Sequence, residues 1–382
     1  MRTLVLTTLN PYPPDSGGKI TTAGVIEYWA TRGLVDVLCL GSQYEHVSIN
    51  TSVTVRTFRQ RGLIARDSTL ETGLMLVEAL LRGKSYVLNK FWSPHLREAV
   101  WIGTAEGRWD VIYVDHLPMA QYIPDGTAFL LDENNVESVI MGQRAARSPS
   151  PLLRALYRRE HSIVQRAEVV LCNRAACVLT VSEEDKQTLE ALGVSTPIKV
   201  LPVLLGDHWV PKQTGRGKRV GVLGSATWEE NREALDWFLR EIVSKLSRDV
   251  DVLVAGRGTS RLVPRETSVA VWDEFSTTEF ARAVDVLAVP LLSGGGIRVK
   301  ILQALEAGIP VVATSKGAEG LHDAPLSIAD SPSEFAMAIE GILFMSDELL
   351  GRLISKGRNY VAERYSFDRF ESVITPLIAY TR

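Results

Sequence analysis

The chain has 382 residues, a length that predicts two domains rather than one. Apolar residues make up 46% of it and charged residues 23%, and the net charge of −3 argues against nucleic acid as the main partner, because such binding usually needs a basic surface. The three cysteines, Cys39, Cys172 and Cys177, suit neither a disulfide framework nor a zinc site, so we expect a reduced, cytoplasmic protein.

The first half of the chain alternates short β-branched runs with helical patterns, which is typical of a parallel sheet with crossover helices. The apolar run at residues 4–8 is expected to be a first strand rather than a signal peptide, and no stretch has the length of a membrane span. Further strands are predicted at 35–40, 53–57, 111–114, 128–132, 176–181 and 199–201. Helices are predicted at 20–32, 69–81, 94–105, 136–143 and 151–171.

A linker and a second α/β series follow. Residues 202–218 lose all periodicity and gather Pro, Gly and basic residues. Strands are then predicted at 219–224, 250–255, 269–271, 286–289 and 311–314, and helices at 301–307, 333–345, 347–363 and 367–381. We therefore predict an α/β fold of two facing Rossmann-like, doubly wound parallel-sheet domains with an interdomain cleft. The predicted boundaries are a first domain at 1–205, a linker at 206–217 and a second domain at 218–366, with the C-terminal helix 367–382 packing back on the first domain.

The most informative motif lies between the strand at 286–289 and the following helix. Gly294, Gly295 and Gly296 let the backbone approach a ligand closely, and Arg298 and Lys300 bring cations to a helix N-terminus. Unpaired amides, fixed positive charge and a helix N-terminus at one point favour a phosphate or diphosphate.

A second glycine loop, residues 11–19, follows the first predicted strand. Gly17 and Gly18 precede the helix at 20–32 and make an anion-friendly turn at the carboxyl edge of the sheet. Glycine pairs are also common in plain strand-to-helix turns, so the motif gains weight only opposite the other loop.

Polar residues end two more strands of the first domain. His116 follows the strand at 111–114 and could donate a hydrogen bond to a sugar or to a reacting group, although a structural histidine is the more frequent case. Glu133 and Asn134 follow the strand at 128–132 and could orient hydroxyls of an acceptor, while Asn135 could equally be a helix N-cap. The two interpretations are balanced.

The segment 144–166 is rich in arginine and carries leucines between the cations. Its basic residues are Arg144, Arg147, Arg154, Arg158, Arg159 and Arg166. Such a face could rest on an anionic membrane or receive a phosphorylated acceptor. The favoured interpretation is a surface helix whose leucines, Leu152 and Leu153 among them, face the core.

Taken together, these motifs resemble the GT-B glycosyltransferases of the large retaining family four, also called group 1, over nearly the whole chain. The resemblance rests on the loop at 11–18, on 181–185, on Trp228 to Asn231, on 294–300 continuing through 317–321, and on the closing 364–368. It implies a first domain that binds the acceptor and a second that binds a nucleotide sugar.

The resemblance also implies roles for individual residues. His116, Arg298 and Lys300 would be catalytic, with His116 bonded to the transferred sugar and the two cations compensating the diphosphate. The donor would further contact Gly17, Gly18, Gly224, Gly294, Gly295, Gly296, Ile297 and Gln303, with its base near Trp272 and Phe275. The acceptor, a small molecule, a glycan or a lipid-linked glycan, would contact Asp15, Glu133 and Asn134. No metal or other cofactor is expected.

Two departures from the family pattern bear on nucleotide binding. The family's Glu-x7-Glu pair corresponds to Gly295 and Gln303, and glutamine lacks the charge-assisted strength of a carboxylate toward ribose hydroxyls. The family's Arg and Lys early in the second domain correspond to Ser225 and Asn231. Two alternatives therefore stay open: a GT-B nucleotide-sugar epimerase or hydrolase, and a GT-B subunit that has lost donor binding and serves as a scaffold.

Overall fold

The computed structural model describes residues 1–60, 79, 83–206, 209–210, 217–264 and 268–381. The chain forms two compact units, one of residues 1–206 with 370–382 and one of residues 207–369. No described helix combines the length and the apolar character that a bilayer span requires.

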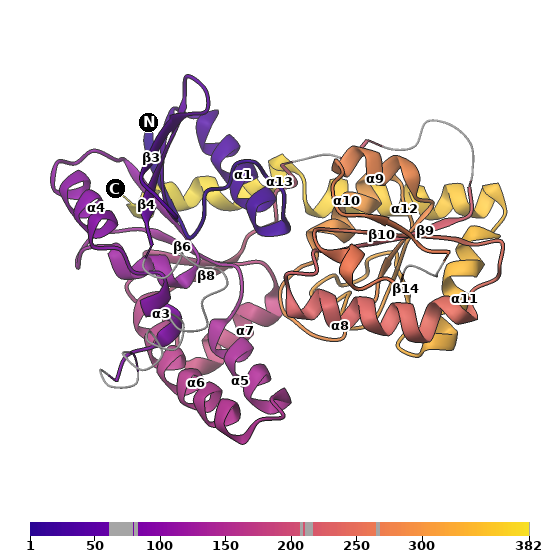
Figure 1. Cartoon of the computed structure of the whole chain (residues 1–382). Coiled ribbons are helices and arrows are strands. Elements are labelled where there is room, and N and C mark those ends of the chain that lie inside the picture. Colours follow the sequence, from indigo (N-terminus) through magenta and orange to yellow (C-terminus); the bar gives the residue numbers. More distant parts are fainter. Residues whose placement is uncertain (61–78, 80–82, 207–208, 211–216, 265–267, 382) are drawn as a thin grey trace. The chain divides into compact units, whose positions relative to one another are not determined.

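The first unit is built on an eight-stranded sheet in the order β3-β4-β2-β1-β5-β6-β7-β8 (Figure 1). β3 pairs with β4 in the antiparallel sense, and the other pairs are parallel. The strands are β1 Arg2–Thr7, β2 Leu34–Gly41, β3 Glu45–Ser48, β4 Val53–Arg59, β5 Val111–Asp115, β6 Leu130–Glu133, β7 Cys177–Thr180 and β8 Ile198–Val200. The predicted strands of this half are confirmed with small shifts at their ends. The sequence analysis missed β3, because all four of its residues are exposed and no apolar run marks it.

Helices cover this sheet on both faces, as crossover connections require. They are α1 Gly17–Ala30, α3 Tyr86–Lys90, α4 Pro94–Ala105, α5 Glu137–Arg147, α6 Pro151–Cys172 and α7 Glu183–Leu192, with the 3-10 turn η1 Leu117–Tyr122. The helix predicted at 69–81 lies outside the described residues apart from Ala79.

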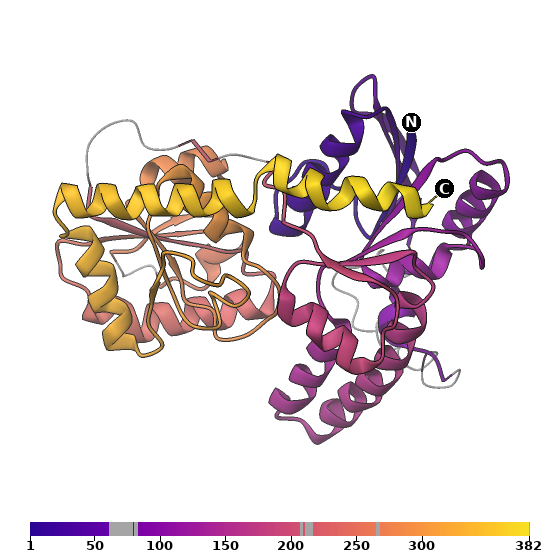
Figure 2. The same ribbon diagram turned by 180° about the vertical axis from the view of Figure 1, so that it is seen from behind.

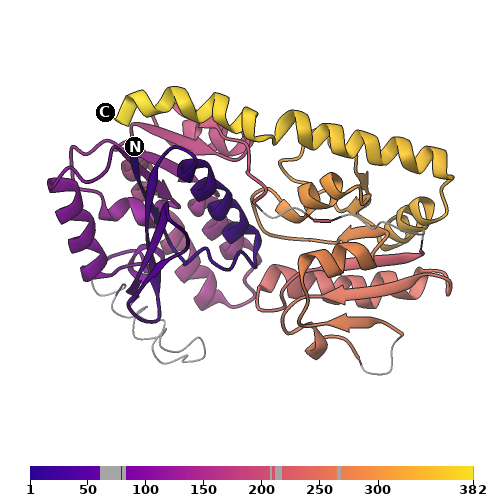
Figure 3. The same cartoon turned by 90° about the horizontal axis from the view of Figure 1, so that it is seen from above.

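The C-terminal segment belongs to the first unit. α13 (Phe367–Ile374) and the 3-10 helix η5 (Thr375–Thr381) extend along this unit in Figures 2 and 3. Phe370 is fully buried, and its ring centroid lies 4.8 Å from that of Tyr28 on α1.

The segment interpreted as the start of the linker also packs on the first unit. Leu204 is buried in the same core cluster as Tyr28, and its Cβ lies 2.9 Å from where a Cβ on Gly24 would be. Residues 202–206 therefore continue the first unit, because their apolar side chains are buried there. Most of the predicted linker 206–217 lies outside the described residues.

The second unit is built on a parallel six-stranded sheet in the order β11-β10-β9-β12-β13-β14. Its strands are β9 Arg219–Leu223, β10 Asp251–Ala255, β11 Ala270–Trp272, β12 Val286–Val289, β13 Val311–Ala313 and β14 Ser327–Ile328. Its helices are α8 Glu229–Trp237, α9 Thr277–Ala283, α10 Val299–Ala307, α11 Pro332–Leu343 and α12 Asp347–Arg364, with the short turns η2 Phe238–Ile242, η3 Val243–Lys245 and η4 Thr259–Arg261. α8 and α12 lie on opposite faces of the sheet (Figure 1). The sequence analysis missed the two-residue edge strand β14.

Both sheets reverse their winding direction at one point. In the first unit this point lies between β1 and β5, and in the second between β9 and β12. Ligands of doubly wound sheets bind beyond the carboxyl ends of the strands at that switch point. From the strand order alone, a ligand of the first unit is expected near residues 8–19 and 116. A ligand of the second unit is expected near residues 224 and 290–300.

Candidate functional site

The glycine loop of the second unit joins β12 to α10 and adopts left-handed backbone conformations. Gly294 has φ +99° and Gly296 has φ +73°, which favour glycine. A Cβ on Gly294 would lie 3.1 Å from Nη2 of Arg298, so the absent side chain leaves room for the guanidinium.

Arg298 is the N-cap residue of α10 and is half-buried. Its Nη1 donates to the carbonyl oxygen of Gly295, whereas the buried Nε and Nη2 have no hydrogen-bond partner among the described residues. Burial lowers the pKa of Arg298, and the charges of Glu319 and Glu230 act in the opposite direction. Buried donors without partners are costly, which makes this guanidinium a natural point for an anion to bind.

Lys300 lies in the first turn of α10, two residues after Arg298. Its Nζ donates to the carbonyl oxygen of Leu223, at the end of β9, over 2.5 Å. Burial, and then the charge of Arg298, lower the pKa of Lys300 to about 8. Two cations, one of which lowers the pKa of the other, therefore lie at a helix N-terminus at the switch point of the second unit. This arrangement favours a multiply charged anion.

The loop after β9 is held by Asn231. Its Nδ2 donates to the carbonyl oxygen of Ser225 over 3.0 Å, and a Cβ on Gly224 would lie 2.9 Å from its side chain. A hollow of about 10 Å³ lies beside these residues and Lys300. At a position where the resemblance would place a cation, Asn231 thus shapes the backbone.

The structure says less about the other residues that were predicted to bind the sugar donor. Gln303 is on α10 and only 2% exposed, so the structure places it in the interior of the unit. Trp272 ends the edge strand β11, and Phe275 packs near Phe280 with ring centroids 6.1 Å apart; both are partly exposed. Ile297 lies in the glycine loop and is also partly exposed. Their contacts with a donor stay predictions.

In the first unit, α1 begins at Gly17, directly after the loop at the end of β1. Gly17 and Gly18 are exposed, and a Cβ on Gly18 would meet nothing within 4 Å. Folding therefore does not require a glycine at position 18, which leaves ligand approach as a reason for it. Asp15 pairs with Lys19 over 2.9 Å on the same loop.

Asp115, at the end of β5, organises the carboxyl edge of this sheet. The side chain is buried, and its Oδ2 accepts from Thr7 Oγ1 at 2.7 Å and Thr22 Oγ1 at 2.8 Å. Its Oδ1 accepts from Asn134 Nδ2 at 2.7 Å and lies 3.0 Å from Nδ1 of His116. One carboxylate thus ties together the ends of β1, β5 and β6 and the first turns of α1.

His116 is held by this carboxylate in a left-handed backbone conformation, with φ +75°. Burial alone would lower the pKa of His116, but the Asp115 carboxylate outweighs it, and the pKa is raised to about 9. The side chain is one quarter exposed. At pH 7 the imidazolium therefore carries a positive charge and can donate a hydrogen bond to a ligand.

Glu133 was expected to follow a strand and face an acceptor, but it is the last residue of β6. It is fully buried, and neither of its carboxylate oxygens has a hydrogen-bond partner among the described residues. Burial and the nearby Glu168 raise the pKa of Glu133 well above its usual value. The expected direct contact with an acceptor is therefore not available to Glu133 in this structure. The N-cap of α5 is Val136, which corrects the assignment of Asn135.

Sequence reasoning missed Asp115, Thr7 and Thr22 as parts of the site. The pair Asp115-His116 at a strand end was a usable signal for the first of them. No local signal marks the two threonines, because only the fold brings Thr22 to a carboxylate 93 residues away along the chain. Among the described residues, no group of His, Cys, Asp and Glu side chains is arranged to hold a metal ion.

Comparison with known proteins agrees with this architecture. Residues 217–344 match the family model described as glycosyl transferases group 1. A search of curated protein sequences finds no match. Sucrose-phosphate synthase from Thermosynechococcus elongatus has a similar structure, with a TM-score of 0.69, 14% identity, and coverage of 99% of this chain and 98% of that one.

Two further solved structures are similar over both chains. The Anabaena protein HepE, in complex with UDP and glucose, aligns with a TM-score of 0.65, 14% identity and 99% coverage of each chain. Trehalose-6-phosphate synthase from Burkholderia multivorans aligns with a TM-score of 0.63, 12% identity, and coverage of 99% of this chain and 98% of that one. The chain has the GT-B fold, and residues 217–344 of its second unit are similar to the group 1 glycosyltransferases. The predicted GT-B fold is confirmed, and the predicted resemblance to group 1 glycosyltransferases is confirmed for residues 217–344. The retaining stereochemistry stays a prediction.

Proposed function

We propose that this protein is a retaining glycosyltransferase that moves a sugar from a nucleoside diphosphate sugar to an acceptor hydroxyl. The observation that carries the proposal is the pair of cations in the second unit. Arg298 keeps two buried donors without partners among the described residues, and Lys300 is half-buried near it at the switch point of the sheet. The similar structure of HepE holds UDP and glucose, which makes UDP the first nucleotide to test.

In the proposed reaction, the bond between the anomeric carbon and the diphosphate oxygen breaks while the acceptor oxygen bonds to that carbon. Negative charge then develops on the leaving diphosphate. The backbone amides of the glycine loop, Arg298 and Lys300 stabilise this charge in a partly water-free setting, where fixed dipoles and cations act most strongly. The acceptor proton passes to the leaving diphosphate oxygen, so the step needs neither a metal ion nor a separate protein base.

His116 has the second role in the proposal. As a cation oriented by Asp115, it donates a hydrogen bond to the transferred sugar near the reacting carbon. Gly17 and Gly18, exposed at the start of α1, are proposed donor contacts of the first unit. Asp15 and Asn134 remain the proposed acceptor contacts.

The decisive experiment is calorimetry of the full chain with UDP, GDP, ADP and dTDP. At least one should bind, and the double variant Arg298→Ala/Lys300→Ala should weaken that binding by about 100-fold or more, since two charge-assisted contacts are lost. The matched control is Arg240→Ala/Arg352→Ala, which removes two exposed arginines elsewhere in the second unit. Equal affinities for both double variants would refute the phosphate role.

Product analysis separates the rival functions. A transferase releases nucleotide only when acceptor is present and keeps the anomeric configuration of the donor, which NMR of the product reports. Turnover of the donor without acceptor would favour an epimerase or hydrolase. Failure of every nucleotide to bind would favour a scaffold subunit, and loss of activity in EDTA would contradict the metal-independent step.

A further inference from the structure

We propose that the hairpin formed by α5 and α6 docks the first unit on the surface of an anionic phospholipid bilayer. The two helices lie side by side in Figures 1 and 2, and the turn between them is at the end of the hairpin away from the sheet. The inference does not depend on the proposed sugar transfer, because it rests on the charge and shape of this hairpin alone.

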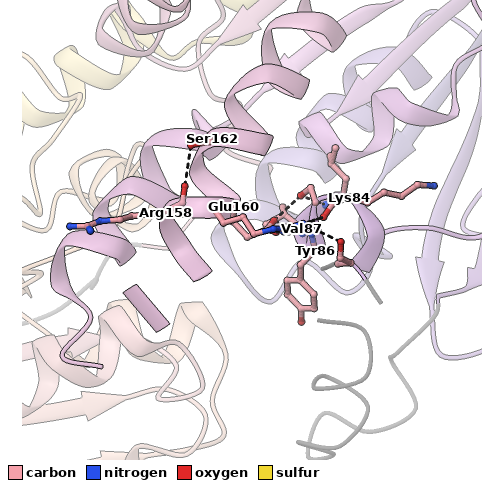
Figure 4. Close-up of polar contacts among 10 residues, drawn as sticks. Lys84, Tyr86, Val87, Arg158, Glu160 and Ser162 are labelled. Carbon is pink, nitrogen blue, oxygen red and sulfur yellow. Dashed lines mark hydrogen bonds and ion pairs between the residues drawn. The ribbon is translucent and has the colours of Figure 1, made fainter. Parts of the chain in front are cut away.

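The first argument is the direction of the carboxylates. Of the three acidic residues of 137–172, Glu160 and Glu168 are buried and Glu137 is partly exposed. Glu168 is fully buried and accepts from Ser138 Oγ at 2.5 Å. Glu160 is 5% exposed and accepts from Ser85 Oγ at 3.0 Å and from the amide of Tyr86 at 2.9 Å (Figure 4). Burial raises the pKa of Glu137.

Four arginines of the hairpin are exposed, and the charge of one of them, Arg144, also acts on Glu137. Arg144, Arg147, Arg158 and Arg166 are exposed, and Figure 4 shows Arg158 extending away from the contacts of Glu160. The outer surface of the hairpin therefore presents cations without any fully exposed carboxylate of its own. Anionic lipid headgroups are complementary to such a surface.

The second argument is the pair of leucines at the turn. Leu152 is 71% exposed and Leu153 is 46% exposed, so the expectation that both face the core is wrong. The reason is geometric, because these residues form the first turn of α6, beyond the part of the helix that packs on the sheet. Exposed leucines flanked by arginines match a bilayer interface, where the leucines enter the acyl region and the guanidiniums stay at the phosphates.

The third argument is that the backbone of the turn leaves few polar groups to desolvate. Pro149 and Pro151 have no N–H group. The amide of Leu153 donates to Ser150 Oγ over 3.4 Å, and the guanidinium of Arg154 donates to the carbonyl oxygen of Ser148 over 3.0 Å. Entry of this turn into the headgroup region therefore costs less than for an uncapped loop.

Other occupants fit less well. Nucleic acid would match the arginines but leave the leucines exposed to water. A second copy of the same face would bring like charges together, which opposes pairing. The bilayer satisfies both features at once.

The test is co-flotation of the full chain with vesicles of phosphatidylcholine alone and of equal parts phosphatidylcholine and phosphatidylglycerol. We expect binding to the anionic vesicles that weakens as salt is added, and little binding to the neutral ones. Leu152→Ser/Leu153→Ser should reduce the partition coefficient by about tenfold or more, and Arg158→Gln/Arg166→Gln should reduce it by about tenfold.

Matched controls in the second unit keep the result interpretable. Leu349→Ser removes a leucine that is 52% exposed, and Arg240→Gln/Arg352→Gln removes two exposed arginines. Both controls should bind vesicles like the wild type, and thermal unfolding should show that every variant is folded. Equal partition of the hairpin and control variants, or no preference for anionic vesicles, would overturn the proposal. So would a concentration-dependent dimer in sedimentation that the leucine variant alone abolishes.

Discussion

The switch points of the two units have the same strand order but opposite electrostatics. In the first unit, the cation His116 is compensated inside the fold by Asp115, and its pKa is raised. In the second unit, Arg298 and Lys300 lie together, and both pKa values are lowered. The difference is that a neighbouring carboxylate favours the charged form of His116, whereas burial disfavours the charged forms of Arg298 and Lys300.

The largest effect is expected from removing the compensation in the first unit. Asp115→Asn removes the carboxylate that raises the pKa of His116 most and leaves the weaker effects of Glu137 and Asp132, so this pKa falls from about 9 and a smaller fraction of the ring is charged near pH 7. We expect sugar transfer at neutral pH to fall by about 100-fold. The pH-rate profile should also change, because wild-type activity should decline only above about pH 9 and that of the variant at lower pH.

The free energy of unfolding gives a second measure of the Asp115–His116 pair. A raised histidine pKa stabilises the fold at low pH, and this contribution is lost as the pH rises through about 9. Asp125→Asn, at an exposed ion pair with Arg174, is the matched control. If both variants gave the same rate and profile, the Asp115–His116 pair would have no part in the reaction.

A second prediction concerns the buried carboxylate of Glu133 in the first unit. Glu133→Gln removes a buried carboxylate without partners, and we expect it to raise the free energy of unfolding at pH 8 by about 1–3 kcal/mol. The carboxyl pKa is raised in the folded state, so the wild type loses stability as the pH rises above the unfolded value of about 4.5. The gain should therefore shrink toward acidic pH.

Urea unfolding across this pH range measures the effect, with the exposed Glu348→Gln as control. A loss of stability in Glu133→Gln at every pH would show instead that the carboxylate is paired in solution, which contradicts the structure.

The last prediction concerns the ammonium group of Lys300 in the second unit. We expect the smallest change here, in the pH dependence of diphosphate affinity. A bound diphosphate favours the ammonium form, so its affinity should fall as the pH rises above about 8, by at most about tenfold per pH unit. Calorimetry at pH 8.5 in buffers of different ionisation enthalpy should detect proton uptake on binding. Lys300→Met should abolish this uptake, and the exposed Lys218→Met should retain it. The same uptake in both variants would assign the proton to another group.

Most of the fold could be predicted because it depends on local patterns. Buried runs such as 111–114 and 286–289 are apolar throughout, and the glycine loop before α10 is marked by three consecutive glycines. The edge strands β3 and β14 could not be predicted, since exposed or very short strands carry no hydrophobic period. The structure places Gly294, Arg298 and Lys300 at the switch point of the second sheet and His116 at that of the first, and their contacts with a ligand stay predictions.

By itself, the sequence determined the α/β class, the two glycine loops and the cations beside one of them, because these depend on neighbouring residues. Only the tertiary structure decided which groups the buried charged side chains contact. Contacts across the sheet brought Thr7 and Thr22 to Asp115, buried Glu133 away from any acceptor and exposed Leu152. Burial and long-range pairing set the protonation and the accessibility of a side chain, and neither property is encoded by its immediate neighbours.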